Sequence, residues 1–152
     1  IYLEQLYTFG AVDRDPFGRV VSVAYFALFP ANGLKVQTST EYSDISWFNV
    51  ESLPELAYDH RQILDTAVQR LKTKLEYTNI VYNLMPAEFT LSQLQKTYEM
   101  ILKRKMDKRN FRKKILSLEL IKPSGKATSG QPNRPSQLYR FSRKAPQFIQ
   151  IV

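Results

Sequence analysis

Two consecutive helix starts in the second half of the chain constrain its fold most strongly. Thr90 and Gln93 have the spacing of a capping box, and Asp107 can cap a second helix. Only a short basic connection at residues 103–106 separates the two helices. Each cap is flanked by apolar residues spaced as a hydrophobic staple, Phe89 with Leu94 and Met106 with Phe111. Two capped helices joined by so short a turn predict a helix-turn-helix.

The residues after the second helix have the composition of a wing. Turn-forming residues follow Ile121, and Leu138–Phe141 then returns as a strand. The loop between them is marked by Pro123, Gly125, Gly130, Pro132 and Pro135. A strand, a basic loop rich in glycine and proline, and a second strand complete a winged helix-turn-helix, which we assign to residues 81–152.

Charge is divided unevenly along the chain. Residues 1–83 hold 7 Lys/Arg and 10 Asp/Glu, a net charge of −3, whereas residues 84–152 hold 15 Lys/Arg and 4 Asp/Glu, a net charge of +11. All of the overall excess of +8 therefore lies in the second half. A strongly basic module suits a polyanionic partner, although a basic solvated surface would give the same count.

The helix expected at Lys108–Leu120 has the faces of a DNA-reading helix. A helical wheel places on its apolar, core-facing side Phe111, Ile115 and Leu118. Arginine can donate two hydrogen bonds to guanine, and asparagine can pair with adenine. The expected contacts with double-stranded operator DNA come from the turn, the helix and the wing: Lys105, Lys108, Arg109, Asn110, Arg112, Lys113 and Arg134. RNA stays open as an alternative, although no RNP-like aromatic strand supports it.

The first half of the chain begins with strand-like patterns. Residues 1–7 read as a strand, and residues 20–29 read as a long, largely buried strand because β-branched and aromatic residues dominate them. The pair Asn32-Gly33 signals a hairpin. Residues 45–48 are expected to form a further short strand, with Trp47 packed in the core or in a dimer interface.

One amphipathic helix closes this half. Apolar residues recur at helical spacing over residues 60–77, and Asp59 with Gln62 is expected to cap this helix. The fold class is therefore α+β. These elements are too few to seal so hydrophobic a sheet, and Ile1 opens directly in a strand, so we expect further residues to precede it in the natural protein.

Several classes of function lack their sequence signals. The chain has no cysteine, which excludes disulfides, thiolate zinc sites and thiol nucleophiles and fits a reducing cytoplasm. No apolar run approaches the about 20 residues needed to cross a bilayer, so no membrane partner is expected. No Walker loop, GxSxG or HExxH motif occurs. The sole histidine, His60, is interpreted as a residue at the start of a helix, in preference to a catalytic base. We assign no catalytic residue and no metal ligand.

Five runs resemble the Nudix-related transcriptional regulators, the NrtR group and its sugar-responsive relatives. These runs are Tyr2–Gly10, Asp13–Pro16, Arg19–Tyr25, Leu53–Ala57 and Asp107–Lys113, and they keep their order over nearly the whole chain. The resemblance implies that residues 1–80 are the C-terminal half of a Nudix-like mixed β-sheet with its closing helix, followed by the winged helix. It also implies a homodimer that binds operator DNA, acts as a repressor, and responds to ADP-ribose or a sugar-like effector.

The loop between the first two strands is the expected effector site. Arg14 and Arg19 suit phosphates, and the carboxylate of Asp15 suits ribose hydroxyls. A salt-bridged turn without a ligand would use the same residues. The residues alone do not favour an effector site over such a turn, and the effector site is expected only because of the resemblance.

The sequence departs from the Nudix pattern in one respect. The Arg-Glu-x-x-Glu-Glu core and the glycine-rich stretch before it do not occur in this chain. No cofactor is therefore required, and magnesium is expected only if a Nudix box lies upstream. Enzymatic activity stays undecided, with a Nudix-type ADP-ribose pyrophosphatase carrying a basic appendage as the alternative function.

Overall fold

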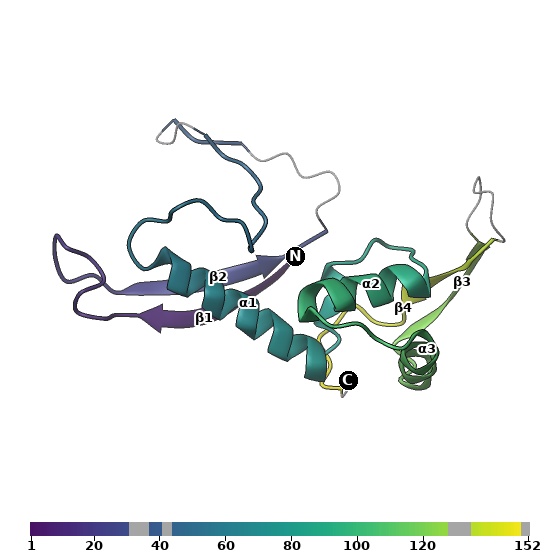
Figure 1. Ribbon diagram of the computed structural model, residues 1–152. Helices are drawn as coiled ribbons and strands as arrows, with labels where there is room; N and C mark the ends of the chain where they lie inside the picture. Colours follow the sequence, from purple (N-terminus) through teal and green to yellow (C-terminus); the bar gives the residue numbers. More distant parts are fainter. Residues whose placement is uncertain (31–36, 41–43, 128–134, 150–152) are drawn as a thin grey trace. The chain divides into compact units, whose positions relative to one another are not determined.

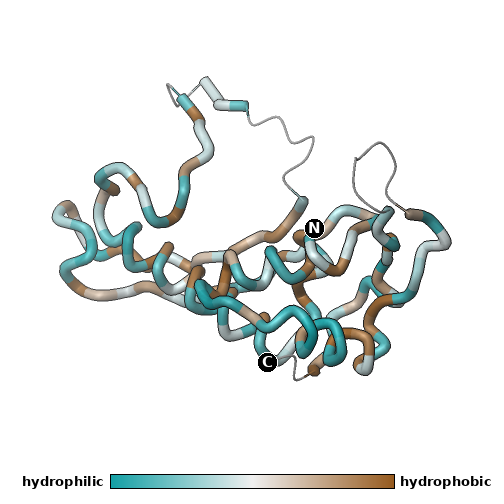
Figure 2. The backbone as a smooth tube through the Cα atoms, turned by 45° about the vertical axis from the view of Figure 1, so that its right-hand side comes forward, coloured by the Kyte–Doolittle hydropathy of each residue, from teal (hydrophilic) through white to brown (hydrophobic). Residues whose placement is uncertain are grey.

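The computed structural model describes residues 1–30, 37–40, 44–127 and 135–149, and the chain divides into two compact units. The N-terminal unit comprises Leu3–Ala27 and Ala31–Gln69, and the C-terminal unit comprises Ile1–Tyr2, Leu28–Pro30 and Arg70–Val152. Figure 1 shows the order of the elements, and hydrophobic residues occur in both units (Figure 2). No helix among the described residues has the length and apolar character that a bilayer crossing requires.

Strands β1 (Tyr2–Phe9) and β2 (Ser22–Leu28) lie side by side and run in opposite directions (Figure 1). The buried residues of these strands are Leu6 and Phe9 in β1 and Leu28 in β2. Other apolar residues of the two strands are exposed, namely Leu3, Tyr7, Val23 and Tyr25. The expectation of a largely buried β2 is therefore wrong, because successive side chains of a strand point to opposite sides, and along β2 half-buried and exposed residues alternate up to the buried Leu28.

The segment expected as a strand at residues 45–48 forms none. Ile45 and Phe48 are about half exposed, and Trp47 is 61% exposed, so the expectation that Trp47 packs in the core is also wrong. An aromatic, β-branched composition favours a strand only where a neighbouring edge accepts its hydrogen bonds, and none pairs with this segment among the described residues. The hairpin expected at Asn32-Gly33 lies outside the described residues.

Helix α1 spans His60–Tyr77, the bounds expected from its periodicity. In the C-terminal unit a short 3-10 helix, η1 (Ile80–Asn83), follows and buries Ile80 and Val81. Helices α2 (Leu91–Leu102) and α3 (Lys108–Ser117) and strands β3 (Ile121–Ala127) and β4 (Gln137–Phe141) complete it. The sequence therefore predicted the order helix, turn, helix, strand, strand correctly.

Capping fixes where α2 and α3 begin. Thr90 accepts a hydrogen bond from the backbone N–H of Gln93, whose side chain accepts one from the N–H of Thr90, so the expected capping box is confirmed. Phe89 and Leu94, the expected staple, are both almost fully buried. At α3 the carboxylate of Asp107 accepts the N–H of Asn110 at 2.7 Å.

Replacing Asp107 by alanine should lower the free energy of unfolding by about 1 kcal/mol, because the first turn of α3 loses the carboxylate that accepts the N–H of Asn110. Urea unfolding followed by circular dichroism measures this change. Asp107→Ser is the matched control, since its hydroxyl also caps a helix and should restore most of the loss. Equal destabilisation by both variants would show that the cap contributes nothing.

The wing pairs β3 with β4 in antiparallel register. Ile121 faces Phe141, Lys122 faces Arg140 and Pro123 faces Tyr139, after which the register shifts before Ala127 meets Gln137. The prediction that the loop begins at Pro123 is wrong, because β3 continues to Ala127: Pro123 pairs with Tyr139, and Gly125 lies in the stretch where the register shifts. Gly125 has a φ of +82°, a conformation that favours glycine.

Two further contacts tie this unit together, and the sequence analysis foresaw neither. Strand β4 also pairs with Phe89, through hydrogen bonds between Phe89 and Tyr139 in both directions. The buried side chain of Asn79 donates to the carbonyl of Ala145 at 3.1 Å and accepts the N–H of Gln147 at 2.8 Å. One asparagine thus fastens the segment after β4 to the start of η1.

Candidate nucleic-acid interface and effector site

Helix α3 is anchored by its apolar side. Phe111 and Ile115 are 6% and 2% exposed, and the ring of Phe111 contacts that of Tyr98 edge-on at a centroid distance of 5.6 Å. The predicted core-facing positions are confirmed for these two residues. Leu118 is half-buried and follows the helix as its C-cap, because the helix ends at Ser117 and not at Leu120.

The opposite side of α3 is cationic and exposed. Lys108, Arg109, Asn110 and Lys113 are all exposed, as is Lys105 in the preceding turn. No acidic residue occurs between Asp107 and Glu119. Without a partner such a face carries like-charge repulsion at i,i+4 spacing, which favours a polyanionic ligand over a merely solvated surface.

Arg112 is placed differently from the other predicted DNA contacts. It is half-buried, and its Nη2 lies 3.4 Å from the hydroxyl of Ser92 at the start of α2. Arg112 was expected to contact DNA from the outward side of α3 together with Arg109 and Lys113, and the placement of its side chain on that side is wrong. Arg112 directly follows the buried Phe111, so its side chain leaves the helix toward α2. Arg134, the predicted wing contact, lies outside the described residues.

The turn between α2 and α3 is held by polar side chains of α2. Glu99 accepts the N–H of Met106 at 2.9 Å, and Gln95 donates both to the carbonyl of Met106 at 2.9 Å and to Glu99 at 3.1 Å. The hydrogen bond from Met106 is the main cause that lowers the pKa of Glu99, followed by the one from Gln95. Gln95 and Glu99 thereby fix the entry of α3. This role of Gln95 and Glu99 was not predicted from the sequence, although a Gln and a Glu four residues apart just before a turn indicate side chains on the same side of a helix that can bond together.

The wing presents further positive charge. Lys122 and Arg140 face each other across β3 and β4, and both are exposed. Directly opposed like charges destabilise a strand pair unless an anion lies between them. Lys126 is instead paired with Glu88 at 3.2 Å. The exposed cations of the wing add to those of α3 in the same unit.

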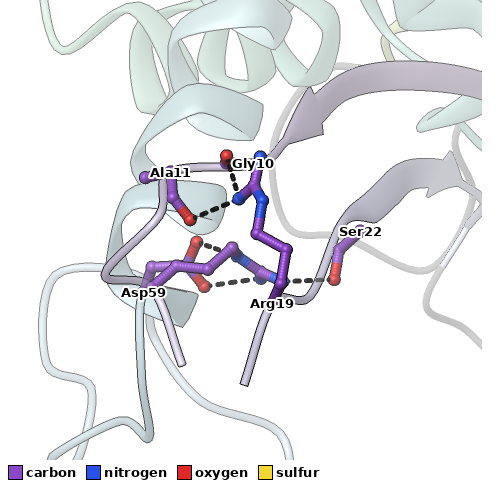
Figure 3. Close-up of polar contacts among 6 residues, drawn as sticks. Gly10, Ala11, Arg19, Ser22 and Asp59 are labelled. Carbon is purple, nitrogen blue, oxygen red and sulfur yellow. Dashed lines mark hydrogen bonds and ion pairs between the residues drawn. The ribbon is translucent and has the colours of Figure 1, made fainter. Parts of the chain in front are cut away.

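The loop between β1 and β2 holds the three predicted effector residues in internal contacts. Arg14 forms two hydrogen bonds of 2.8 Å with the carboxylate of Asp59 and a third of 2.7 Å with Ser22. Asp15 accepts the N–H of Phe17 at 2.8 Å. Arg19 donates to two carbonyls at the end of β1, those of Gly10 and Ala11 (Figure 3). The salt bridge of this loop therefore joins Arg14 to Asp59 ahead of α1, whereas Asp15 and Arg19 bond only to backbone groups.

A cavity of about 460 Å³ adjoins this loop. Arg14 and Asp59 line it together with Asp13, Tyr58 and Gln62, whereas Asp15 and Arg19 do not. Its walls therefore offer a guanidinium, two carboxylates, an amide and an aromatic ring. Only Arg14 of this set was expected to bind an effector. Asp59 and Gln62 were expected as helix-capping residues, because the start of α1 lies far along the chain from this loop.

Substituting Arg14 with glutamine should raise the pKa of Asp59 toward its ordinary value. The hydrogen bonds from Arg14 hold that pKa below its usual range, and they outweigh the opposing effect of burial. Because the folded-state pKa is depressed, the pair stabilises the fold above the ordinary carboxyl pKa of about 4 and this contribution disappears as pH falls through the lowered value. Carboxyl-carbon NMR titration measures the pKa directly.

The control for this titration is Arg61→Gln, which removes a cation from α1 that pairs with the exposed Asp65 at 3.1 Å. This variant should leave the pKa of Asp59 unchanged. In thermal unfolding, the wild type should be more stable than Arg14→Gln at pH 7 and should lose that advantage at low pH. A pKa of Asp59 that is the same in wild type and Arg14→Gln would contradict the pairing.

No group of three or more histidine, aspartate or glutamate side chains converges among the described residues. Asp15 is occupied with the N–H of Phe17.

Comparison with known proteins agrees with this geometry. A family model described as the NrtR DNA-binding winged helix domain matches residues 81–141, which contain α2, α3, β3 and β4. Residues 81–141 are therefore similar to the winged helix domain of NrtR proteins. The resemblance found in the sequence is thereby confirmed for the part of the chain that carries the basic helix.

Similarity to NrtR proteins also extends beyond this domain. The ADPR responsive transcriptional repressor NtrR of Acinetobacter baylyi is 39% identical over 145 residues, which are 93% of this chain and 56% of that protein. The crystal structure of Shewanella oneidensis NrtR complexed with a 27mer DNA matches with a TM-score of 0.79 at 30% identity, over 93% of this chain and 64% of that one. A MutT/nudix family protein from Enterococcus faecalis matches with a TM-score of 0.64 at 25% identity, over 93% and 62%. The chain thus spans less than two thirds of each relative.

Proposed function

We propose that this chain acts as a DNA-binding transcriptional repressor that responds to a small effector such as ADP-ribose or a sugar. Residues 81–152 bind operator DNA, and residues 1–80 belong to the effector-binding, Nudix-like part. The observation that carries the proposal is α3, an Asp107-capped helix with an apolar side in the core and an unopposed cationic side in solvent. Two similar proteins support this proposal: one is an ADPR responsive transcriptional repressor, and the other is an NrtR whose crystal structure contains DNA.

The exposed residues of α3 divide into two roles on DNA. Arg109 and Asn110 lie in the first turn of the helix and have the geometry to read guanine and adenine edges in the major groove. Lys105, Lys108 and Lys113 lack a planar fork and suit phosphate oxygens. The opposed Lys122 and Arg140 of the wing would meet the backbone beside the groove. We expect two copies of the chain to bind one operator as a homodimer in the cytoplasm.

The effector site is the cavity beside Arg14. A phosphate of the effector would compete with Asp59 for the guanidinium of Arg14, because both are anions that accept two parallel N–H donors. The freed Asp59 and the neighbouring Asp13 could then accept hydrogen bonds from ribose hydroxyls, and Tyr58 offers a ring for stacking. Effector binding would thus replace the ion pair between Arg14 and Asp59 by one between Arg14 and the phosphate, and would thereby alter the start of α1.

Fluorescence anisotropy with a duplex taken from upstream of the protein's own gene tests the proposal. Binding should exceed that of a scrambled duplex and should weaken with salt, with a slope of log affinity against log salt near −5 if about six cations neutralise phosphates. ADP-ribose should release the upstream duplex, whereas AMP at the same concentration should not. Equal, weak binding to both duplexes would rule out an operator-binding repressor.

Hydrolysis of ADP-ribose is the second candidate, because the fold also matches a MutT/nudix family protein. Incubation of ADP-ribose with the protein and magnesium should then yield AMP and ribose 5-phosphate. Chromatography of the reaction decides between the two functions. Unchanged ADP-ribose, together with effector-dependent release of DNA, would leave the repressor as the function.

A further inference from the structure

The residues around Arg112 form a small cavity with an unbalanced charge. The cavity has a volume of about 210 Å³ and is lined by the start of α2, one side chain of α3 and the start of β4. Its polar lining comes from Arg112, Thr90, Ser92, Ser136 and Gln137. No carboxylate is among the lining residues, so the guanidinium has no counter-charge there.

Arg112 is poorly satisfied by the rest of the protein. Its Nε is buried and has no hydrogen-bond partner within the part of the chain that the structure describes. Its Nη2 makes a single contact, with the hydroxyl of Ser92 at 3.4 Å, at the long end of the hydrogen-bond range. A half-buried cation without an anion costs free energy, because water is partly removed from it and nothing replaces that water. Such a cost is recovered when an anionic ligand enters the cavity.

The start of α2 adds donors on the other wall. Thr90 caps the N–H of Gln93, which leaves the N–H groups of Leu91 and Ser92 in the first turn without an intrahelical acceptor. These groups carry the partial positive charge of a helix of 12 residues. The hydroxyl of Ser92 accepts from Arg112 and keeps its own hydrogen to donate. A guanidinium, a hydroxyl and two backbone N–H groups are the donor set that phosphate oxygens prefer.

We propose that this cavity binds one backbone phosphate of the DNA, and that Arg112 positions the strand without reading a base. The inference rests on the proposed DNA-binding function, and it assigns to Arg112 a role different from that of Arg109. Arg109 and Lys113 lie on the exposed side of the same helix. A phosphate held beside Arg112 therefore fixes the depth at which α3 lies in the groove, while Arg109 and Asn110 meet the bases.

Two variants test this with the full 152-residue chain, and a third serves as their control. Ser92→Glu places a carboxylate in the cavity, where it repels phosphate, although a carboxylate in the first turn favours the helix itself. Gln93→Glu adds the same charge one residue on, keeps the capping box and does not line the cavity. Arg112→Gln removes the guanidinium charge. Circular dichroism confirms that all three variants fold.

Anisotropy titrations with the upstream and the scrambled duplex should show a uniform loss. Ser92→Glu and Arg112→Gln should each lower the affinity for both duplexes by the same factor of about ten. Arg112→Gln should also reduce the slope of log affinity against log salt by about one. Gln93→Glu should change both affinities by less than about threefold. Loss confined to the upstream duplex in Arg112→Gln would mean that Arg112 reads a base, and losses no larger than those of Gln93→Glu would overturn the phosphate site.

Duplexes that carry one neutral methylphosphonate at a time identify the phosphate. A methylphosphonate at one position should lower the affinity of the wild type about tenfold. The same duplex should not lower the affinity of Arg112→Gln further, because that variant has already lost the contact with this phosphate. If no position behaves so, and inorganic phosphate raises the melting temperature of the wild type but not of Arg112→Gln, the cavity binds free anions and the DNA assignment fails. A wild type that does not distinguish the upstream from the scrambled duplex would instead refute the proposed repressor function.

Discussion

Phe111→Ala should lower the free energy of unfolding of the C-terminal unit by about 3–5 kcal/mol and abolish DNA binding. The ring is 6% exposed and lies edge-on to Tyr98, which is fully buried in α2. Its removal leaves a cavity at the contact that joins α3 to α2. Since a small domain is stable by only about 5–15 kcal/mol in total, this loss leaves a substantial unfolded fraction.

Hydrogen exchange of peptides from α2 and α3 measures the loss, because amide protection reports the free energy of local opening. Leu116→Ala is the matched control. Leu116 belongs to the same helix but is 44% exposed, so the free energy of unfolding should change by no more than about 0.5 kcal/mol. Unchanged protection in Phe111→Ala would show that α3 is not held by its apolar side.

The parts of the fold that local chemistry determines were predictable from the sequence. A cap such as Asp107 acts within one turn, and the apolar side of a helix repeats at a fixed spacing, so α1, α2 and α3 and the burial of Phe111 followed directly. The aromatic segment at residues 45–48 shows the limit of this reasoning. Strand formation depends on a partner edge, which a single segment does not encode.

The candidate site was predictable only where one element supplies it. The cationic side of α3 could be read from a helical wheel, whereas the position of Arg112 depends on where the start of α2 lies. The same holds for the clamp of Gln95 and Glu99 on Met106 and for Asp59 opposite Arg14. These contacts join residues from separate elements, so only the assembled fold shows them.

Arg109→Ala should weaken binding to the upstream duplex by about 1–3 kcal/mol, which is about 5- to 150-fold in affinity. Arg109 is exposed in the first turn of α3, between the cap and the buried Phe111, where the side chains of a recognition helix reach base edges. A guanidinium that donates twice to one guanine loses both hydrogen bonds on truncation. The loss should therefore fall mainly on the upstream duplex and relax the preference at one base pair.

Lys113→Ala is the comparison, because Lys113 lies one helical turn further on and is equally exposed. A lysine that contacts phosphate contributes to every sequence, so this variant should weaken the upstream and the scrambled duplex by the same factor and reduce the salt slope by about one. Anisotropy titrations of both variants against a set of duplexes with single base-pair changes separate the two roles. If Arg109→Ala loses the same affinity on every duplex, as Lys113→Ala should, then Arg109 contacts only the backbone, and the specificity of α3 must come from Asn110 or from the shape of the DNA.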